Sequence, residues 1–162
     1  MELSCSDNPE SVWQTITDTV GNYKIDFPDC ELDKRVEIII VDDNDIPHNY
    51  CILNLQEQSS NSLGYSTVYY KLHIDTHEVD NYLHVQGYAN SEGTNAVIEH
   101  ERKLSNWLYS REFIYILPND LVLRQRWVYN NSIVYSWGVI TTKEQRFNKS
   151  VTKFLDSFEL HA

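Results

Sequence analysis

The chain has 162 residues, 41% hydrophobic and 23% charged, so it is long and apolar enough to bury the core of one globular domain. Acidic residues outnumber basic ones by 24 to 13, which gives a formal net charge of −11. A field of this sign repels phosphate backbones and anionic lipid surfaces, so we expect no nucleic-acid partner and no binding to anionic membranes. No apolar run approaches the roughly 20 residues that a membrane-spanning helix needs, so no membrane insertion is expected.

The N-terminus bears on the domain boundaries and on the compartment. Residues 1–11 are polar, and we expect them to form a flexible segment before a single domain at residues 12–162. The start of the sequence has neither the basic nor the apolar region of a signal peptide, which favours a cytoplasmic protein on the sequence as given. Leu3-Ser4-Cys5 resembles the end of a lipoprotein signal, so an exported protein or a lipoprotein is the alternative if a leader precedes this sequence.

Three cysteines, Cys5, Cys30 and Cys51, cannot all pair within one chain. We expect unpaired thiols in a reducing compartment, and one disulfide with a free Cys5 if the protein is exported. The absence of a Cys-x-x-Cys motif disfavours zinc ribbons and thioredoxin-like redox chemistry.

The first half of the domain is predicted to consist of strands. Tyr23, Ile25 and Phe27 alternate with polar residues, which is the period of a half-buried strand, and a turn at Gly21 joins them to an earlier strand. A continuous apolar run follows, and an aspartate-rich turn at residues 42–45 comes after it. The predicted strands cover residues 13–17, 23–27, 35–41, 49–57 and 68–74.

A helix is predicted to begin at Asp75, where the hydrophobic period changes from two residues to about 3.6. Asp75 is expected to cap the helix N-terminus, with Glu78 as its capping-box partner, and the helix is expected to end near Gly93. Its predicted apolar side consists of Val79, Tyr82, Leu83, Val85 and Ala89.

Three or four strands are predicted after this helix, and we place them at residues 96–104, 109–117, 121–129 and 133–140. Asn130-Asn131 is the predicted two-residue turn between the last two, because asparagine tolerates a positive φ.

The C-terminus is predicted to return to a helix, with Thr142 and Gln145 as a capping box. Its apolar residues are spaced i, i+4, i+7 and i+11, so they share one face that must pack on the sheet. Two helices separated by runs of hairpin-linked strands predict an α+β fold on an antiparallel sheet. The predicted apolar face consists of Phe147, Val151, Phe154 and Phe158.

Three short stretches carry a family resemblance. Tyr23-Lys24-Ile25-Asp26-Phe27-Pro28 resembles a strand end of the form aromatic-x-hydrophobic-x-Phe-Pro, and residues 154–160 resemble a closing Phe-x-x-Ser-Phe-x-Leu signature. Arg111-Glu112-Phe113 with residues 121–130 resembles the late hairpin that precedes the final helix. In their order, these stretches resemble the PsbP-like superfamily, which includes the extrinsic photosystem protein, the Ran-binding nuclear-import factor and many small bacterial proteins.

The resemblance spans nearly the whole chain, and its motifs concern packing more than chemistry. It implies a central antiparallel sheet flanked by helices, an α/β/α sandwich, and a binding protein without a shared catalytic centre. Two stretches depart from the family pattern. Asp29-Cys30-Glu31 replaces the usual Gly/Pro turn, and residues 105–107 replace a glycine-rich approach to the Arg-Glu-Phe strand.

His73 and His77 are the candidate metal ligands of the sequence. On a continuous strand they would share one face with Asp75, and two histidines with a carboxylate are a donor set for zinc or non-haem iron. A helix that begins at Asp75 would turn His77 away from His73. We therefore predict no metal and no cofactor, and a metal-dependent enzyme built on the His73 region remains an alternative.

Charged residues within the predicted strands are expected to lie on a solvated face of the sheet. This prediction covers Glu99-His100-Glu101 and Arg111-Glu112.

The hairpin around Asn130 supplies the candidate binding residues. Trp127 and Tyr129 share one face of the predicted strand, and Arg124 and Arg126 share the other. We expect the tryptophan side to pack under the C-terminal helix, which leaves both arginines on the open face. Exposed arginine and aromatic side chains are typical anchors of protein interfaces. The candidate binding residues are Arg124, Arg126, Trp127 and Trp137.

The sequence contains no P-loop, no dinucleotide-binding fingerprint, no Gly-x-Ser-x-Gly and no His-Glu-x-x-His motif. Together with the family resemblance, this favours a non-catalytic binding or accessory protein with a protein partner. A carrier of a small apolar ligand held between sheet and helix is a further alternative.

Overall fold

The computed structural model describes residues 13–19, 21–28, 36–40, 48–53 and 62–161. The predicted flexible segment at residues 1–11, the predicted turn at residues 42–45, and Cys5 and Cys30 lie outside the described residues. No helix within the described residues combines the length and the apolar character that crossing a membrane requires.

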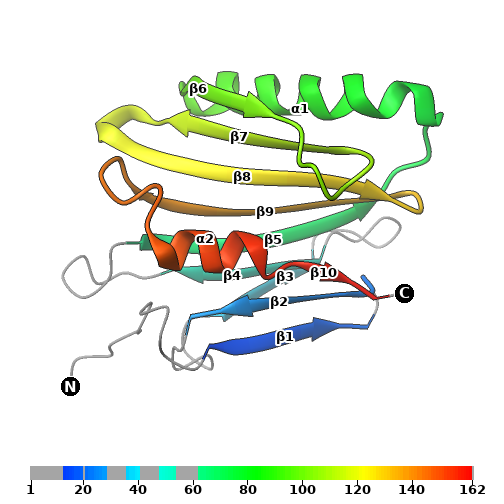
Figure 1. Ribbon diagram of the computed structural model, residues 1–162, viewed down its shortest axis with the longest axis horizontal. Helices are drawn as coiled ribbons and strands as arrows, with labels where there is room; N and C mark the ends of the chain where they lie inside the picture. Colours follow the sequence, from blue (N-terminus) through cyan, green and yellow to red (C-terminus); the bar gives the residue numbers. More distant parts are fainter. Residues whose placement is uncertain (1–12, 20, 29–35, 41–47, 54–61, 162) are drawn as a thin grey trace.

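Seven strands form the central sheet, and every neighbouring pair is antiparallel (Figure 1). Consecutive strands pair throughout except at the centre, where β5 pairs with β9. In spatial order the strands are β3 (Val36–Ile40), β4 (His48–Leu53), β5 (Ser62–Lys71), β9 (Ile133–Thr142), β8 (Leu121–Asn130), β7 (Ser110–Ile116) and β6 (Val97–Arg102).

A smaller sheet contains the first hairpin and the end of the chain. Its strands are β1 (Gln14–Asp18), β2 (Tyr23–Phe27) and β10 (Glu159–Leu160), with β2 in the middle and antiparallel to both neighbours. The sequence correctly predicts the first hairpin, but it does not indicate that this hairpin forms a separate sheet completed by the C-terminus.

The β8–β9 turn lies one residue later than predicted. Asn130 still pairs with Ile133, so the two turn residues are Asn131 and Ser132. Both have a positive φ, of 49° and 62°, which matches the twist of a two-residue hairpin.

The first helix, α1 (Val79–Thr94), begins later than predicted, after the short 3₁₀ helix η2 (Thr76–Glu78). The Asp75 side chain makes no capping hydrogen bond, so the predicted capping box is wrong. The helix ends at Asn95, whose left-handed φ of 54° terminates it beyond Gly93.

The buried side of α1 is narrower than the sequence pattern predicts. Val79, Leu83 and Gly87 are buried at intervals of four residues. Val85 is exposed because it lies about 200° around the helix from Leu83. Ala89, also predicted on the apolar side, is exposed as well.

The second helix, α2 (Lys149–Asp156), is shorter than predicted and has a different cap. Asn148 Oδ1 accepts a hydrogen bond from the Val151 amide at 2.8 Å, whereas Thr142 is the last residue of β9. The predicted Thr142–Gln145 capping box is therefore wrong. Val151 and Phe154 are buried on the helix, and Phe158 is buried just after it.

Phe147 precedes α2 and is 61% exposed, so the predicted apolar stripe is wrong at this residue.

Each face of the central sheet has its own hydrophobic cluster. The helix α1 covers the face that carries Phe113, Tyr115 and Trp127, which we call the α1 face. On the opposite face, which carries Val128, Tyr135 and Trp137, α2 and the smaller sheet lie side by side (Figure 1). We call this the α2 face. The predicted α+β fold, with helices on both sides of an antiparallel sheet, is confirmed, and the smaller sheet shares one of the two layers.

Candidate functional site

A row of charged side chains crosses three neighbouring strands on the α2 face and ends at a tryptophan on a fourth. Arg102 on β6 is paired with Glu112 on β7, Glu112 with Arg126 on β8, and Arg126 with Trp137 on β9. Side chains directly opposite each other on antiparallel strands project from the same face, so this register brings them together. Arg124 joins the row because it lies two residues before Arg126 on β8.

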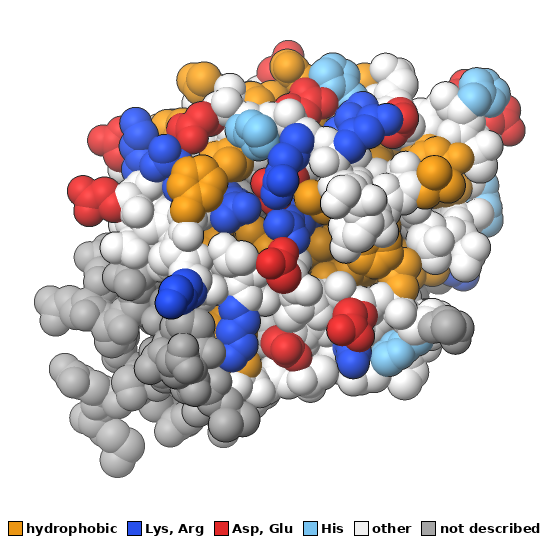
Figure 2. All heavy atoms as spheres, viewed as in Figure 1, with side chains coloured by type: hydrophobic (Ala, Val, Ile, Leu, Met, Phe, Trp, Pro, Cys, Tyr) orange, Lys and Arg blue, Asp and Glu red, His pale blue; other side chains and the backbone are white. Residues whose placement is uncertain are grey.

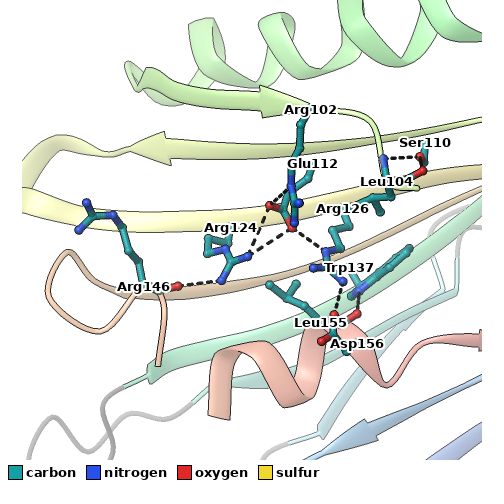
Figure 3. A network of polar contacts seen from close by, with 10 residues as sticks. All are labelled: Arg102, Leu104, Ser110, Glu112, Arg124, Arg126, Trp137, Arg146, Leu155 and Asp156. Carbon is teal, nitrogen blue, oxygen red and sulfur yellow. Dashed lines mark hydrogen bonds and ion pairs between the residues drawn. The ribbon is translucent and has the colours of Figure 1, made fainter. Parts of the chain in front are cut away.

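Glu112 is the centre of this cluster, because its two carboxylate oxygens accept hydrogen bonds from three arginines (Figure 3). Arg126 Nε donates to Glu112 Oε2 at 2.6 Å, and Arg102 Nε donates to Oε1 at 3.0 Å. Arg124 Nη2 lies 3.4 Å from Oε1 and 3.3 Å from Oε2. With only 1% of its surface exposed, Glu112 is a buried charge that depends on these partners.

The environment of Glu112 keeps it ionised. Burial alone would raise its pKa, but hydrogen bonds from Arg126 and Arg102 and the charges of Arg126 and Arg124 outweigh burial, and the pKa lies below its usual value. Burial lowers the pKa of the Arg124 guanidinium, Glu112 opposes this effect, and the nearby Arg126 adds to it.

The cluster is attached to the C-terminal end of α2. Arg126 Nη1 donates to Asp156 Oδ1 at 2.7 Å, and Trp137 Nε1 donates to the carbonyl oxygen of Leu155 at 2.9 Å. Phe158 stacks on Trp137 with ring centroids 4.0 Å apart. Trp137 therefore fixes the position of α2 on the sheet.

The segment before α2 borders the cluster on its other side. Arg124 Nη1 donates to the carbonyl oxygen of Arg146 at 2.9 Å, and Arg146 Nε donates to Glu99 Oε1 at 3.1 Å. The guanidinium carbons of Arg124 and Arg146 lie 5.2 Å and 4.9 Å from the ring centroid of Phe147. These are cation–π distances, so two arginines hold an exposed aromatic ring beside the cluster.

Two pockets flank Arg102, and we call them together the arginine groove. Figure 2 shows Lys and Arg side chains near the middle of this side of the molecule, with hydrophobic side chains on both sides of them. The larger pocket, of about 450 Å³, is lined by Glu99, His100, Arg102, Glu112, Ile114, Arg124 and Phe147. The smaller pocket, of about 260 Å³, is lined by Arg102, Leu104, Ser105, Asn106, Trp107, Arg126, Trp137, Leu155, Asp156 and Phe158.

The structure places the four predicted binding residues on two different faces. Arg124 and Arg126 line the groove but are buried, at 5% and 9% exposure, so the prediction that they lie on an open face is wrong. Trp127 is buried in the cluster beneath α1, not beneath the C-terminal helix as predicted. Trp137 lines the smaller pocket, beside α2.

The prediction of a solvated sheet face is right for Glu99 and His100, which are exposed, and wrong for Glu112. Glu101 is half-buried, and its Oε1 atom lies 2.6 Å from His84 Nδ1 and 3.6 Å from Arg111 Nε.

The sequence also does not identify Arg102, Arg146 and Phe147 as members of a site. Their only sequence signal is the basic pair Arg102-Lys103 and the proximity of Arg146 to Phe147.

His73 and His77 are both exposed, the first between β5 and η2 and the second within η2. Among the residues with a described position, no group of three or more His, Cys, Asp or Glu side chains is arranged to hold a metal ion.

Comparison with known proteins gives a likeness of fold without a likeness of sequence. No protein-family model matches the sequence, and a search of curated proteins finds no match. The solution structure of cyanobacterial PsbP (CyanoP) from Synechocystis sp. PCC 6803 matches with a TM-score of 0.57 and 14% identity, over 98% of each chain. The chain therefore has a PsbP-like fold, as its short motifs predict, and at this identity the likeness concerns the fold alone.

Proposed function

We propose that this protein is a non-catalytic binding or accessory protein that contacts a protein partner through the arginine groove. The observation that carries the proposal is the exposed Phe147 ring, held by the guanidinium groups of Arg124 and Arg146 at the edge of a pocket. Arginine and aromatic side chains around a small cavity are the usual centres of binding energy in protein interfaces.

The chemistry of the groove supports binding more than proton transfer. Glu112, the buried carboxylate at its centre, already accepts hydrogen bonds from three arginines, and its lowered pKa keeps it ionised. A general acid or base needs a pKa near the working pH and a free path to the substrate. Glu112 suits neither requirement, and a structural role in holding the arginines fits it better.

The two alternative functions have less support. An apolar carrier would enclose its ligand between sheet and helix, whereas the larger pocket is open and its lining includes the buried charges of Glu112 and Arg124. For a metal-dependent enzyme at the His73 region, no surrounding residue with a described position completes a donor set.

Truncation of Phe147 tests the proposal. We expect Phe147→Ala to lose most of a partner that the wild-type protein captures from the cell that produces it, because truncating a central aromatic anchor typically costs about 2 kcal/mol or more in binding. Tyr88→Ala is the matched control, since Tyr88 is 47% exposed on α1, which covers the opposite face. Equal capture of the partner by wild type and Phe147→Ala would exclude this surface.

A further inference from the structure

Arg102 has hydrogen-bonding capacity that its neighbours do not use. It is the last residue of β6, its side chain is 49% exposed, and it lines both pockets of the groove. Its Nε donates to Glu112, and within the described residues neither Nη atom has a hydrogen-bond acceptor. The bond at Nε fixes the orientation of the guanidinium plane and leaves the edge formed by the two Nη atoms available.

The carboxylates that line the groove already have other arginine partners. Asp156 accepts from Arg126 at 2.7 Å, and Glu99 accepts from Arg146 at 3.1 Å. Around Glu112, three guanidinium groups face this carboxylate and Asp156, which leaves one positive charge in excess. Arg102 is the most exposed of the three arginines, so the excess positive charge is accessible there.

The charge of the whole molecule limits the kind of anion that can bind. A polyanion would be repelled by the field of a chain with a net charge of −11. A single carboxylate at Arg102 would respond mainly to the local cluster, because ions screen exposed charges beyond roughly 8 Å at physiological ionic strength. A carboxylate can also accept two parallel N–H bonds from the planar guanidinium edge, which makes it a better geometric match than a spherical anion.

The rest of the groove favours apolar groups on either side of that carboxylate. The exposed ring of Phe147 borders the larger pocket, and the half-buried indole of Trp107 borders the smaller one.

We propose that the arginine groove binds a segment of a partner protein in which one carboxylate, paired with the two Nη atoms of Arg102, is flanked by apolar side chains. This inference rests on the proposed function, since it specifies the chemistry of the partner that the groove would contact. It assigns the specificity to Arg102, whereas Phe147 contributes apolar contact.

Short peptides provide the test. The probes are acetyl-Phe-Glu-Phe-amide, its Gln analogue, and acetyl-Ala-Phe-Phe with a free C-terminal carboxylate, each titrated into the isotopically labelled protein while the arginine Nε–H signals are followed by NMR. We expect the Glu peptide to shift the Arg102 signal and to bind about tenfold or more tightly than the Gln peptide, because hydrogen bonds to charged groups are among the strongest in proteins. Tighter binding of the third peptide would identify a chain terminus as the source of the carboxylate.

Three variants complete the test. Arg102→Gln should remove the preference for the Glu peptide, and Arg102→Lys should weaken it because lysine keeps the charge and lacks the two-pronged edge. Lys71→Gln, which removes an exposed positive charge at the end of β5, should leave binding unchanged. Equal binding of the Glu and Gln peptides to wild type, or an unchanged preference in Arg102→Gln, would overturn the inference. If Phe147→Ala still loses the captured partner while no peptide shifts the Arg102 signal, the proposed function stands and only the carboxylate assignment fails.

Discussion

Glu112 determines whether the α2 face tolerates its buried arginines. Replacing it by glutamine keeps the shape of the side chain and removes the negative charge, so Arg124 and Arg126 would remain buried with an uncompensated charge. Removing one member of a buried ion pair typically costs about 3–5 kcal/mol. We expect Glu112→Gln to lower the free energy of unfolding by an amount in this range, as measured by urea denaturation.

The effect of this substitution should depend on pH in a definite direction. The pKa of Glu112 is lower in the folded protein than its ordinary value of 4.5, so the charge stabilises the folded state above that value and less as the pH falls toward the folded pKa. The difference in unfolding free energy between wild type and Glu112→Gln should therefore shrink as the pH is lowered below about 4.5. Glu159→Gln is the control, because Glu159 forms an exposed ion pair with Lys24, and such a pair contributes about 0–1 kcal/mol. A difference that stays constant or grows in acid would contradict this reading of Glu112.

The sequence predicts two of the arginines of the candidate site, Arg124 and Arg126, and misses Glu112. Arg124 and Arg126 stand out as charges within a strongly β-prone run, so they are identifiable without a structure. That Glu112 lies directly opposite Arg126 depends on the register between β7 and β8. This register is set by the conformation of the short 3₁₀ turn at Pro118–Asp120, which joins the two strands. The alternation of residues along each strand does not reveal that conformation.

At the scale of the helices, α1 approaches the sheet through Gly87. A Cβ atom at this position would lie 2.0 Å from Cζ of Phe113, whose side chain is buried and has little room to move, and the Tyr115 hydroxyl donates to the carbonyl oxygen of Gly87 at 3.1 Å. Overpacking of a core costs about 1–3 kcal/mol, and alanine recovers up to about 1 kcal/mol in helix propensity.

We expect Gly87→Ala to lower the midpoint of thermal unfolding, because the steric cost exceeds the gain in helix propensity. Gly93→Ala, in the same helix with open space around the new Cβ, should raise the midpoint slightly. Circular dichroism during heating measures both variants. A stabilised Gly87→Ala protein would mean that α1 does not pack closely against β7.

The start of α2 gives a second test at this scale. Asn148→Ala should lower the free energy of unfolding by about 1 kcal/mol, because it removes the acceptor for the Val151 amide at the helix N-terminus. Thr142→Ala should change it by less than about 0.5 kcal/mol, since Thr142 is exposed at the end of β9. Chemical denaturation of both variants measures the two effects. A larger loss of stability in Thr142→Ala than in Asn148→Ala would contradict the assignment of Asn148 as the cap.

The sequence predicts most of the strands and helices, but not the face on which the C-terminal helix packs. Trp127 and Trp137 both look like core residues by their surroundings, and residue parity places them on opposite faces of the sheet. Either face therefore offers an aromatic surface to a helix. The face on which α2 packs depends on β10, which follows α2 and pairs with β2. This pairing joins a strand near the start of the chain to one near its end. A pairing this distant in sequence leaves no periodic signal.

On the scale of the whole molecule, β8 and β9 belong to both hydrophobic clusters. Trp127 and Val134 face the α1 cluster, whereas Val128 and Tyr135 face the α2 cluster. A disturbance of either layer therefore acts on strands that the other layer needs. That residues 12–162 form a single domain stays a prediction, which unfolding experiments can test.

Leu83→Ala tests whether the two layers unfold together. Leu83 is fully buried beneath α1, and its truncation should lower the free energy of unfolding by about 2–5 kcal/mol. In a Trp127→Phe background the remaining tryptophans, Trp13, Trp107 and Trp137, all lie in or against the α2 cluster, so their fluorescence reports on the layer opposite Leu83. If the domain is one cooperative unit, Leu83→Ala shifts the fluorescence transition and the far-ultraviolet circular dichroism transition to the same lower urea concentration. Loss of helix signal before any change in fluorescence would instead show that the α1 layer unfolds independently of the layer on the other side of the sheet.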